Sequence, residues 1–174
     1  MKTLDLPKLR QTYDYDCGAQ ALQSILVYYG IELSEDILIK HANTNEEIGT
    51  LSKDILTVLK RYNLQYDQRR MSIEDLKNYI HINIPVIILL QAWSKDPVDY
   101  KNNYDHGHWV IAIGYDKEKI IFEDPYSFKH TWLKFQELKD RWHAKEDQKI
   151  LKHYGIAVYG KKAKYESSGI VHMD

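Results

Sequence analysis

Residues 108–124 have the sequence HWVIAIGYDKEKIIFED, and this stretch carries the clearest strand signal in the chain. Trp109 to Tyr115 is apolar and rich in β-branched residues, which predicts a strand. The next four residues are polar and predict a turn, and Ile120 to Glu123 predicts a returning strand. Two strands joined by a short turn form an antiparallel hairpin. His108, at the start of the first strand, should therefore lie beside Asp124, at the end of the second.

The chain before this hairpin has mostly helical patterns. Asp16 is suited to cap a helix, apolar residues follow it at helical spacing, and Gly30 is suited to end that helix. Similar signals predict three more helices, each with a serine at its start. The four predicted helices run from Cys17 to Tyr29, from Ser34 to His41, from Ser52 through an apolar stripe at Ile55, Leu56 and Leu59, and from Ser72 to Ile80.

Strand signals dominate the second part of the chain. Val86 to Gln91 has the apolar, β-branched composition of a fully buried strand, and Tyr154 to Gly160 predicts a final strand. Ser94 to Asp105 is polar and predicts a loop, while Phe135 to Trp142 predicts a short helix. Helices followed by antiparallel strands indicate the α+β class. We expect a single domain over residues 1–174, with the N-terminal helical part packed on a C-terminal antiparallel sheet.

Composition excludes several classes of function. Lysine and arginine number 24 and aspartate and glutamate 25, so a net charge of −1 gives no global field for nucleic acid or anionic membranes. The single cysteine, Cys17, allows neither an intrachain disulfide nor a multi-thiolate zinc site. No apolar run approaches the roughly 20 residues of a membrane helix. Met1 to Lys8 has no apolar core typical of a secretory signal, so we expect a cytoplasmic protein.

Cys17 is the first candidate for chemistry. It lies in the first turn of a predicted helix, where the helix dipole and the free amides favour a thiolate. Gly18 follows it and would let a substrate backbone approach closely. Gln11 precedes it by six residues and could return in a turn, and a glutamine amide is a known oxyanion donor. The alternative interpretation is a small, buried and inert residue.

A nucleophilic thiol also needs a base, and His108 is the best of the eight histidines because a strand start holds it rigidly beside Asp124. Asp124 would orient the imidazole, although an Asp-Pro pair is also a common turn opener. His106 is the second candidate for the base. His106-Gly107-His108 could also ligate zinc, but nothing in the sequence marks a third ligand, and we expect neither a metal nor a cofactor.

The tryptophans are expected to be structural. Trp109 follows His108 on a strand, so it faces the opposite side of the sheet, toward the core. Trp93 closes the strand before the Ser94–Asp105 loop and is a candidate for the rim of the cleft.

Three segments together resemble a known family. The run from Gln11 to Leu22, QTYDYDCGAQAL, resembles the active-site segment of the bacteriocin-processing cysteine peptidases, peptidase family thirty-nine. That family is best known as N-terminal domains of ABC exporters that cut leader peptides after a double glycine. His108-Trp109-Val110-Ile111 resembles its catalytic histidine strand, and Asp124-Pro125 its third motif. The chain resembles a stand-alone member.

The resemblance implies a papain-like fold and a mechanism. Cys17 would be the nucleophile, His108 the general base, Asp124 the orienting group, and Gln11 an oxyanion donor. The implied activity is that of a cysteine peptidase or amidase acting on a peptide or protein through a thioester, with a partner protein as a possible source of specificity. Two alternatives stay open: an acyltransferase that uses the same thiol, and a non-catalytic peptide-binding module.

Overall fold

The computed structural model describes residues 1–173. Its main sheet has the strand order β2-β9-β3-β4-β5-β6, every neighbouring pair is antiparallel, and β1 pairs with the end of β4. A separate hairpin joins β7 to β8. The strands are β1 (Lys2–Thr3), β2 (Gln65–Arg70), β3 (Val86–Gln91), β4 (Gly107–Tyr115), β5 (Lys119–Glu123), β6 (Thr131–Lys134), β7 (His143–Glu146), β8 (Lys149–Lys152) and β9 (Tyr154–Tyr159).

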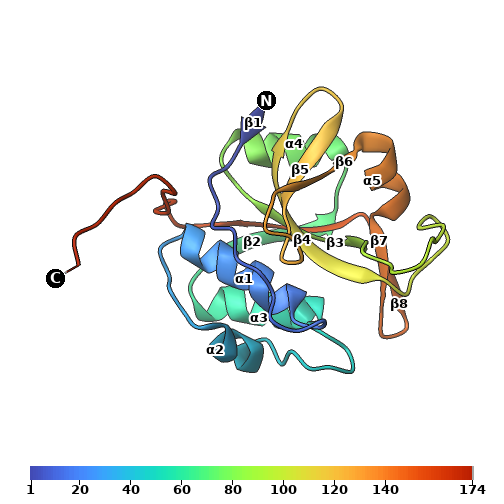
Figure 1. Ribbon diagram of the computed structural model, residues 1–174, viewed down its shortest axis with the longest axis horizontal. Coiled ribbons are helices and arrows are strands. Elements are labelled where there is room, and N and C mark those ends of the chain that lie inside the picture. Colours follow the sequence, from blue (N-terminus) through green and yellow to red (C-terminus); the bar gives the residue numbers. More distant parts are fainter. Residues whose placement is uncertain (174) are drawn as a thin grey trace.

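Helices cover both faces of this sheet. In Figure 1, α1, α2 and α3 lie on one side of the sheet, and α4 and α5 lie on the other. The helices are α1 (Cys17–Tyr28), α2 (Glu35–His41), α3 (Ser52–Arg61), α4 (Ile73–His81) and α5 (Phe135–Arg141). One continuous apolar core joins them to strands β3, β4 and β9. The predicted α+β class is confirmed, with the difference that α4 packs on the face opposite α1. No helix within residues 1–173 is long and apolar enough to cross a membrane.

The predicted hairpin is present as β4 and β5. Ile111 pairs with Glu123, and a bulge between Ala112 and Gly114 shifts the register toward the turn. Asp116 closes the turn by accepting hydrogen bonds from the backbone amides of Glu118 and Lys119. The pairing brings the first residues of β4 beside the residue that follows β5, as expected for a short antiparallel connection.

Two of the predicted helix caps are wrong. Asp16 occupies the N-cap position of α1, but its carboxylate accepts the backbone N–H groups of Thr12 and Tyr13 instead of capping the helix. Ser52 is the first residue of α3 instead of its cap, and Glu146 of β7 accepts its N–H and hydroxyl groups. In each case a partner outside the helix takes the hydrogen bond that local sequence assigns to the cap.

Candidate active site

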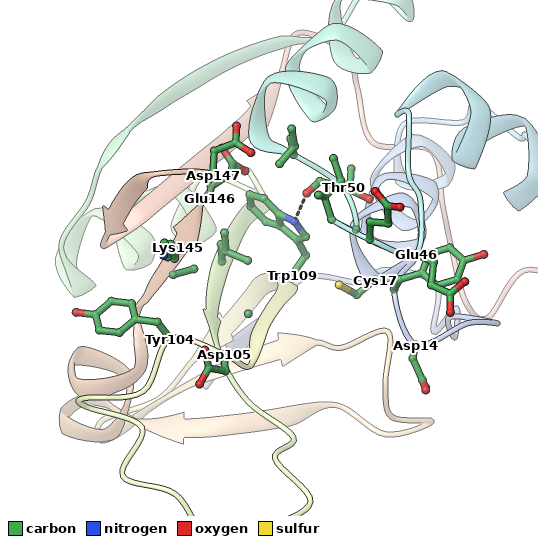
Figure 2. A pocket seen from close by; sticks show the side chains of 18 residues that line it. Asp14, Cys17, Glu46, Thr50, Tyr104, Asp105, Trp109, Lys145, Glu146 and Asp147 are labelled. Carbon is green, nitrogen blue, oxygen red and sulfur yellow. Dashed lines mark hydrogen bonds between the residues drawn. The ribbon is translucent and has the colours of Figure 1, made fainter.

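Cys17 begins α1, and its position follows from the loop before it. The Asp16 carboxylate is buried and accepts hydrogen bonds from the backbone amides of Thr12 and Tyr13. These bonds hold the segment from Gln11 onward against the start of the helix. Burial raises the pKa of Asp16 to about 6; the Tyr13 and Thr12 amides oppose this shift, and Glu35 reinforces it. Figure 2 shows the Cys17 sulfur turned toward a cavity beside Trp109. The first turn of α1 is thereby fixed against the sheet.

Gly18 holds α1 close to the sheet. A Cβ atom at Gly18 would lie 2.5 Å from Cβ of Thr50 and 2.9 Å from Cδ1 of Trp109. The Trp109 indole in turn donates a hydrogen bond to the Thr50 carbonyl, at 2.9 Å. The glycine is therefore required for the contact between helix and sheet. The sequence did not indicate this packing role, and the expectation that Gly18 also serves the approach of a substrate backbone stays a prediction.

His108 and Asp124 meet as the hairpin predicts. His108 Nε2 lies 2.7 Å from Asp124 Oδ1, and both side chains are buried. His106, the second candidate for the base, lies on the loop before β4 and donates its backbone N–H to the buried Gln91 side chain. His108 is therefore the histidine that the fold pairs with Asp124.

His108 and Asp124 each stabilise the charged form of the other. Burial lowers the pKa of His108, but the hydrogen bond to Asp124 and the interaction with Cys17 outweigh burial and raise that pKa to about 9. Burial acts to raise the pKa of Asp124, but the bond to His108 outweighs it and lowers that pKa below its ordinary value. Both shifts favour the charged forms of the pair, an imidazolium beside a carboxylate. A cation beside a cysteine favours the thiolate.

Asp124 is held by three further donors, two of which the sequence did not indicate. Its Oδ1 atom also accepts the Tyr126 backbone N–H at 2.9 Å, and its Oδ2 atom accepts the Trp93 indole N–H and the Thr131 hydroxyl, each at 3.1 Å. The Tyr126 bond is local and typical of an aspartate that opens a turn. The other two come from the end of β3 and the start of β6, and no local pattern predicts them.

Gln11 lies close to the same corner. Its backbone N–H donates to the Pro125 carbonyl at 2.9 Å, which joins the loop before α1 to the residue that follows Asp124. The side-chain amide donates to the Tyr13 carbonyl at 2.6 Å, and its Oε1 atom is buried without a hydrogen-bond partner among the described residues. An oxyanion role would require this amide to turn from Tyr13 toward the substrate.

Two adjoining cavities meet at these residues. One, of about 530 Å³, is lined by Cys17 and Trp109, and the other, of about 490 Å³, by Gln11 and His108. They share Asp14, Asp105 and Gly107, so together they form one groove along the candidate residues. The part beside Cys17 is acidic (Figure 2): among the described residues that line it, one is a lysine, Lys145, and six are carboxylates, Asp14, Glu46, Glu47, Asp105, Glu146 and Asp147.

Sequence comparison places the chain in a family. The profile of the Peptidase_C39 like family matches residues 3–150. The chain belongs to this family. The match includes Cys17, His108 and Asp124. Comparison with curated proteins gives no significant match.

Solved structures of C39 peptidases share the fold. The peptidase domain of Streptococcus ComA, an ABC transporter involved in quorum sensing, aligns with a TM-score of 0.68 and 20% identity over 90% of this chain and 98% of that chain. A putative C39-like peptidase from Bacillus anthracis aligns with a TM-score of 0.68 and 18% identity over 94% and 100%. A double glycine motif protease from an AMS/PCAT transporter, solved with the leader peptide, aligns with a TM-score of 0.68 and 16% identity over 91% and 94%.

Proposed function

We propose that this C39-like protein is a cysteine peptidase in which Cys17, His108 and Asp124 act as a triad. The observation that carries the proposal is the buried hydrogen bond between His108 and Asp124 next to the only thiol of the chain. A nucleophile, a base within its reach and a group that orients the base are the parts that thiol catalysis needs. The family supports a peptidase, and the geometry supports these residues within it.

The reaction follows from the two ring nitrogens of His108. Nε2 is engaged by Asp124, so Nδ1 is the atom that exchanges protons with Cys17 and the substrate. The thiolate attacks the scissile carbonyl carbon, the C–N bond breaks, and the amine leaves with the proton from Nδ1. Water then attacks the thioester while Nδ1 takes one of its protons, the C–S bond breaks, and the acid leaves with the thiolate and the imidazolium restored. Gln11 and the Cys17 backbone amide would stabilise the oxyanion in both steps.

The proposed substrate is a peptide in extended conformation. The groove formed by the two cavities passes both Cys17 and His108, as the path of an extended chain would require. Its acidic part favours a neutral or basic segment over an acidic one. Peptides with a double-glycine motif are the first substrates to test, because a protease of similar fold is a double glycine motif protease solved with its leader peptide.

The test is cleavage of a peptide library, with and without added amines, by the wild type and by Cys17→Ala. We expect hydrolysis products with the wild type and no turnover with Cys17→Ala, while circular dichroism shows that the variant is folded. An amide product that appears only with added amine would replace the proposal by acyl transfer. Equal binding of a peptide by both proteins, without turnover in either, would replace it by a peptide-binding module.

A further inference from the structure

Trp93 has a backbone conformation that a large side chain rarely adopts. Its φ angle is +60°, in the left-handed region, two residues beyond the end of β3. For a residue other than glycine such a conformation is strained and persists only where its surroundings hold it. The residue before it, Ala92, continues the pairing with the β4 side by donating to the His106 carbonyl. The chain therefore turns sharply at Trp93, and the turn directs the side chain toward Asp124.

Two contacts hold the Trp93 ring. Its Nε1–H donates to Asp124 Oδ2 at 3.1 Å, and its ring packs on Tyr126 with centroids 4.6 Å apart. Tyr126 in turn presents its ring edge-on to His108, with centroids 6.5 Å apart. The two aromatic rings thus flank the pair of His108 and Asp124. Trp93 itself is 45% exposed, whereas Asp124 is 2% exposed, so the indole lies between the carboxylate and water.

Trp93 also separates two cavities. On one side it lines the cavity that holds Gln11 and His108, and on the other it lines a smaller cavity of about 310 Å³ that reaches Asp124. Loss of the indole would join these spaces and admit water to the carboxylate. Water there would screen the attraction between Asp124 and His108, because that attraction depends on a low local dielectric.

We infer that Trp93 is a positioning residue for the reaction: its indole N–H fixes Oδ2 of Asp124, so that Oδ1 stays directed at His108, and its ring shields their hydrogen bond from water. A catalytic role for Trp93 rests on the proposed function. The hydrogen bond between His108 and Asp124 that Trp93 would protect exists whether or not a peptide is cleaved. Thr131 and the Tyr126 amide hold the same carboxylate but do not cover it.

The experiment measures the His108 proton directly. In water, the Nε2–H of a buried imidazolium bonded to a carboxylate gives a low-field NMR signal only while its exchange with solvent is slow. Trp93→Ala should accelerate this exchange about tenfold or more, because the cover is lost. Trp93→Phe should retain the signal at a shifted position, since the ring stays and only the donor is removed. The rate of Cys17 alkylation at pH 7 should fall with the first variant and fall less with the second.

Trp132 supplies the matched control. It is 50% exposed and lines the same smaller cavity, but its ring packs under Lys119 and not on Asp124. Trp132→Ala should leave both the His108 signal and the alkylation rate unchanged. An unchanged signal in Trp93→Ala, or its absence from the wild type, would overturn the inference. If the signal responds as expected but the wild type cleaves no peptide, the positioning role stands and the proposed function fails.

Discussion

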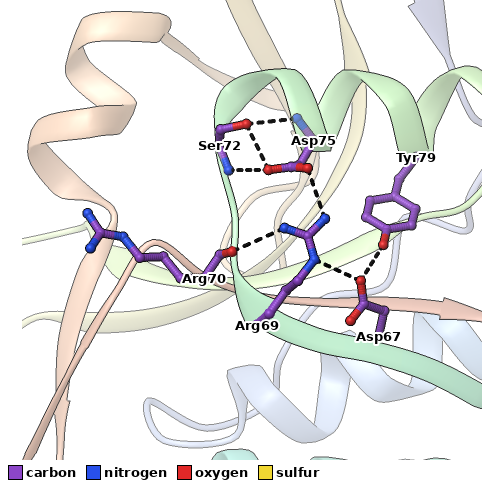
Figure 3. A network of polar contacts seen from close by, with 6 residues as sticks. All are labelled: Asp67, Arg69, Arg70, Ser72, Asp75 and Tyr79. Carbon is purple, nitrogen blue, oxygen red and sulfur yellow. Dashed lines mark hydrogen bonds and ion pairs between the residues drawn. The ribbon is translucent and has the colours of Figure 1, made fainter.

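Two polar networks in this protein pair aspartate with a basic side chain, one in the groove and one at the surface. In the groove, Asp124 accepts hydrogen bonds from His108, Trp93, Thr131 and the Tyr126 amide. At the surface, where β2 meets α4, a guanidinium bridges two carboxylates (Figure 3). We refer to that surface group as the β2–α4 network, which consists of Asp67, Arg69, Ser72, Asp75 and Tyr79.

The charged groups of the β2–α4 network are one guanidinium and two carboxylates. Arg69 donates to Asp67 and Asp75, each at 2.9 Å, and Ser72 forms a capping box with Asp75 at the start of α4. The bond to Arg69 holds the pKa of Asp75 well below its usual range, and the two carboxylates raise that of Arg69. In the groove the partner of the aspartate is instead an imidazole, a group that can give its proton to a reacting atom and take it back, which a guanidinium cannot do. The identity of the basic group, guanidinium or imidazole, therefore separates a structural network from a reactive one.

Among the changes that test the difference between the two networks, removal of the Asp124 carboxylate should have the largest effect on cleavage and stability. Asp124→Ala leaves a buried His108 without its carboxylate and leaves three other donors unpaired. We expect peptide cleavage to fall by about 10³-fold or more, with lower stability because buried polar groups lose their partner. Cleavage rates and thermal unfolding measure the two effects. Asp75→Ala is the matched variant in the β2–α4 network, and a similar loss of cleavage there would contradict the distinction.

Gln11 comes next in expected effect. Gln11→Ala should lower the cleavage rate by about 10²- to 10³-fold if its amide binds the oxyanion. The Michaelis constant should change little, because the oxyanion forms only in the reaction. Gln68 on β2, which accepts the Tyr154 hydroxyl, supplies a control glutamine outside the groove. An unchanged rate in Gln11→Ala would leave Gln11 with its structural bonds to Tyr13 and Pro125 alone.

Substitution of Gly18 should move the nucleophile, Cys17, and leave the hydrogen bonds of Asp124 intact. Gly18→Ala places a methyl group against Thr50 and Trp109, so the start of α1 must shift away from the sheet. We expect a loss of about 1–3 kcal/mol in the free energy of unfolding and slower alkylation of Cys17. Gly169→Ala is the control, since a Cβ there meets only the Glu166 backbone and side chain at 3.3 Å or more. Full stability in Gly18→Ala would show that the contact can relax.

Disruption of the β2–α4 network should have the smallest effect. Arg69→Met should cost at most about 1 kcal/mol, because its ion pairs are partly exposed. Since the pKa of Asp75 is lowered by folding, this contribution is present above about pH 3.8, the ordinary pKa, and is lost as the pH falls below it. Urea unfolding of both proteins at pH 7 and pH 2 measures the difference. A marked change in Cys17 alkylation would contradict the separation of the two networks.

Local patterns predicted the parts of the site that are close in sequence. The hairpin brought His108 to Asp124 because a short turn fixes which residues face each other. Val86 to Gln91 was predicted as a buried strand from its apolar, β-branched composition, and the structure confirms that all six residues are buried. The Ser72 cap was likewise correct, since its partner Asp75 is three residues away.

The parts that sequence did not predict depend on distant partners. Strand β2, QYDQRR, lacks alternation and becomes a strand because β9 offers it an antiparallel edge. Asp16 was expected to cap α1, but the loop amides of Thr12 and Tyr13 take its carboxylate. Trp93 was expected only at the rim of the cleft. Its bond to Asp124 was not predicted, because it joins residues 31 positions apart. Long-range contacts of this kind leave no periodic signal in the sequence.

The most direct test of the central claim is the rate of Cys17 alkylation by iodoacetamide as a function of pH, in the wild type and in His108→Ala. The chain has one thiol, so the signal has a single source. We predict that the wild-type thiol reacts readily at neutral pH and that His108→Ala loses this reactivity. Identical pH profiles for the two proteins, or an inert thiol in the wild type, would contradict the pairing of Cys17 with His108.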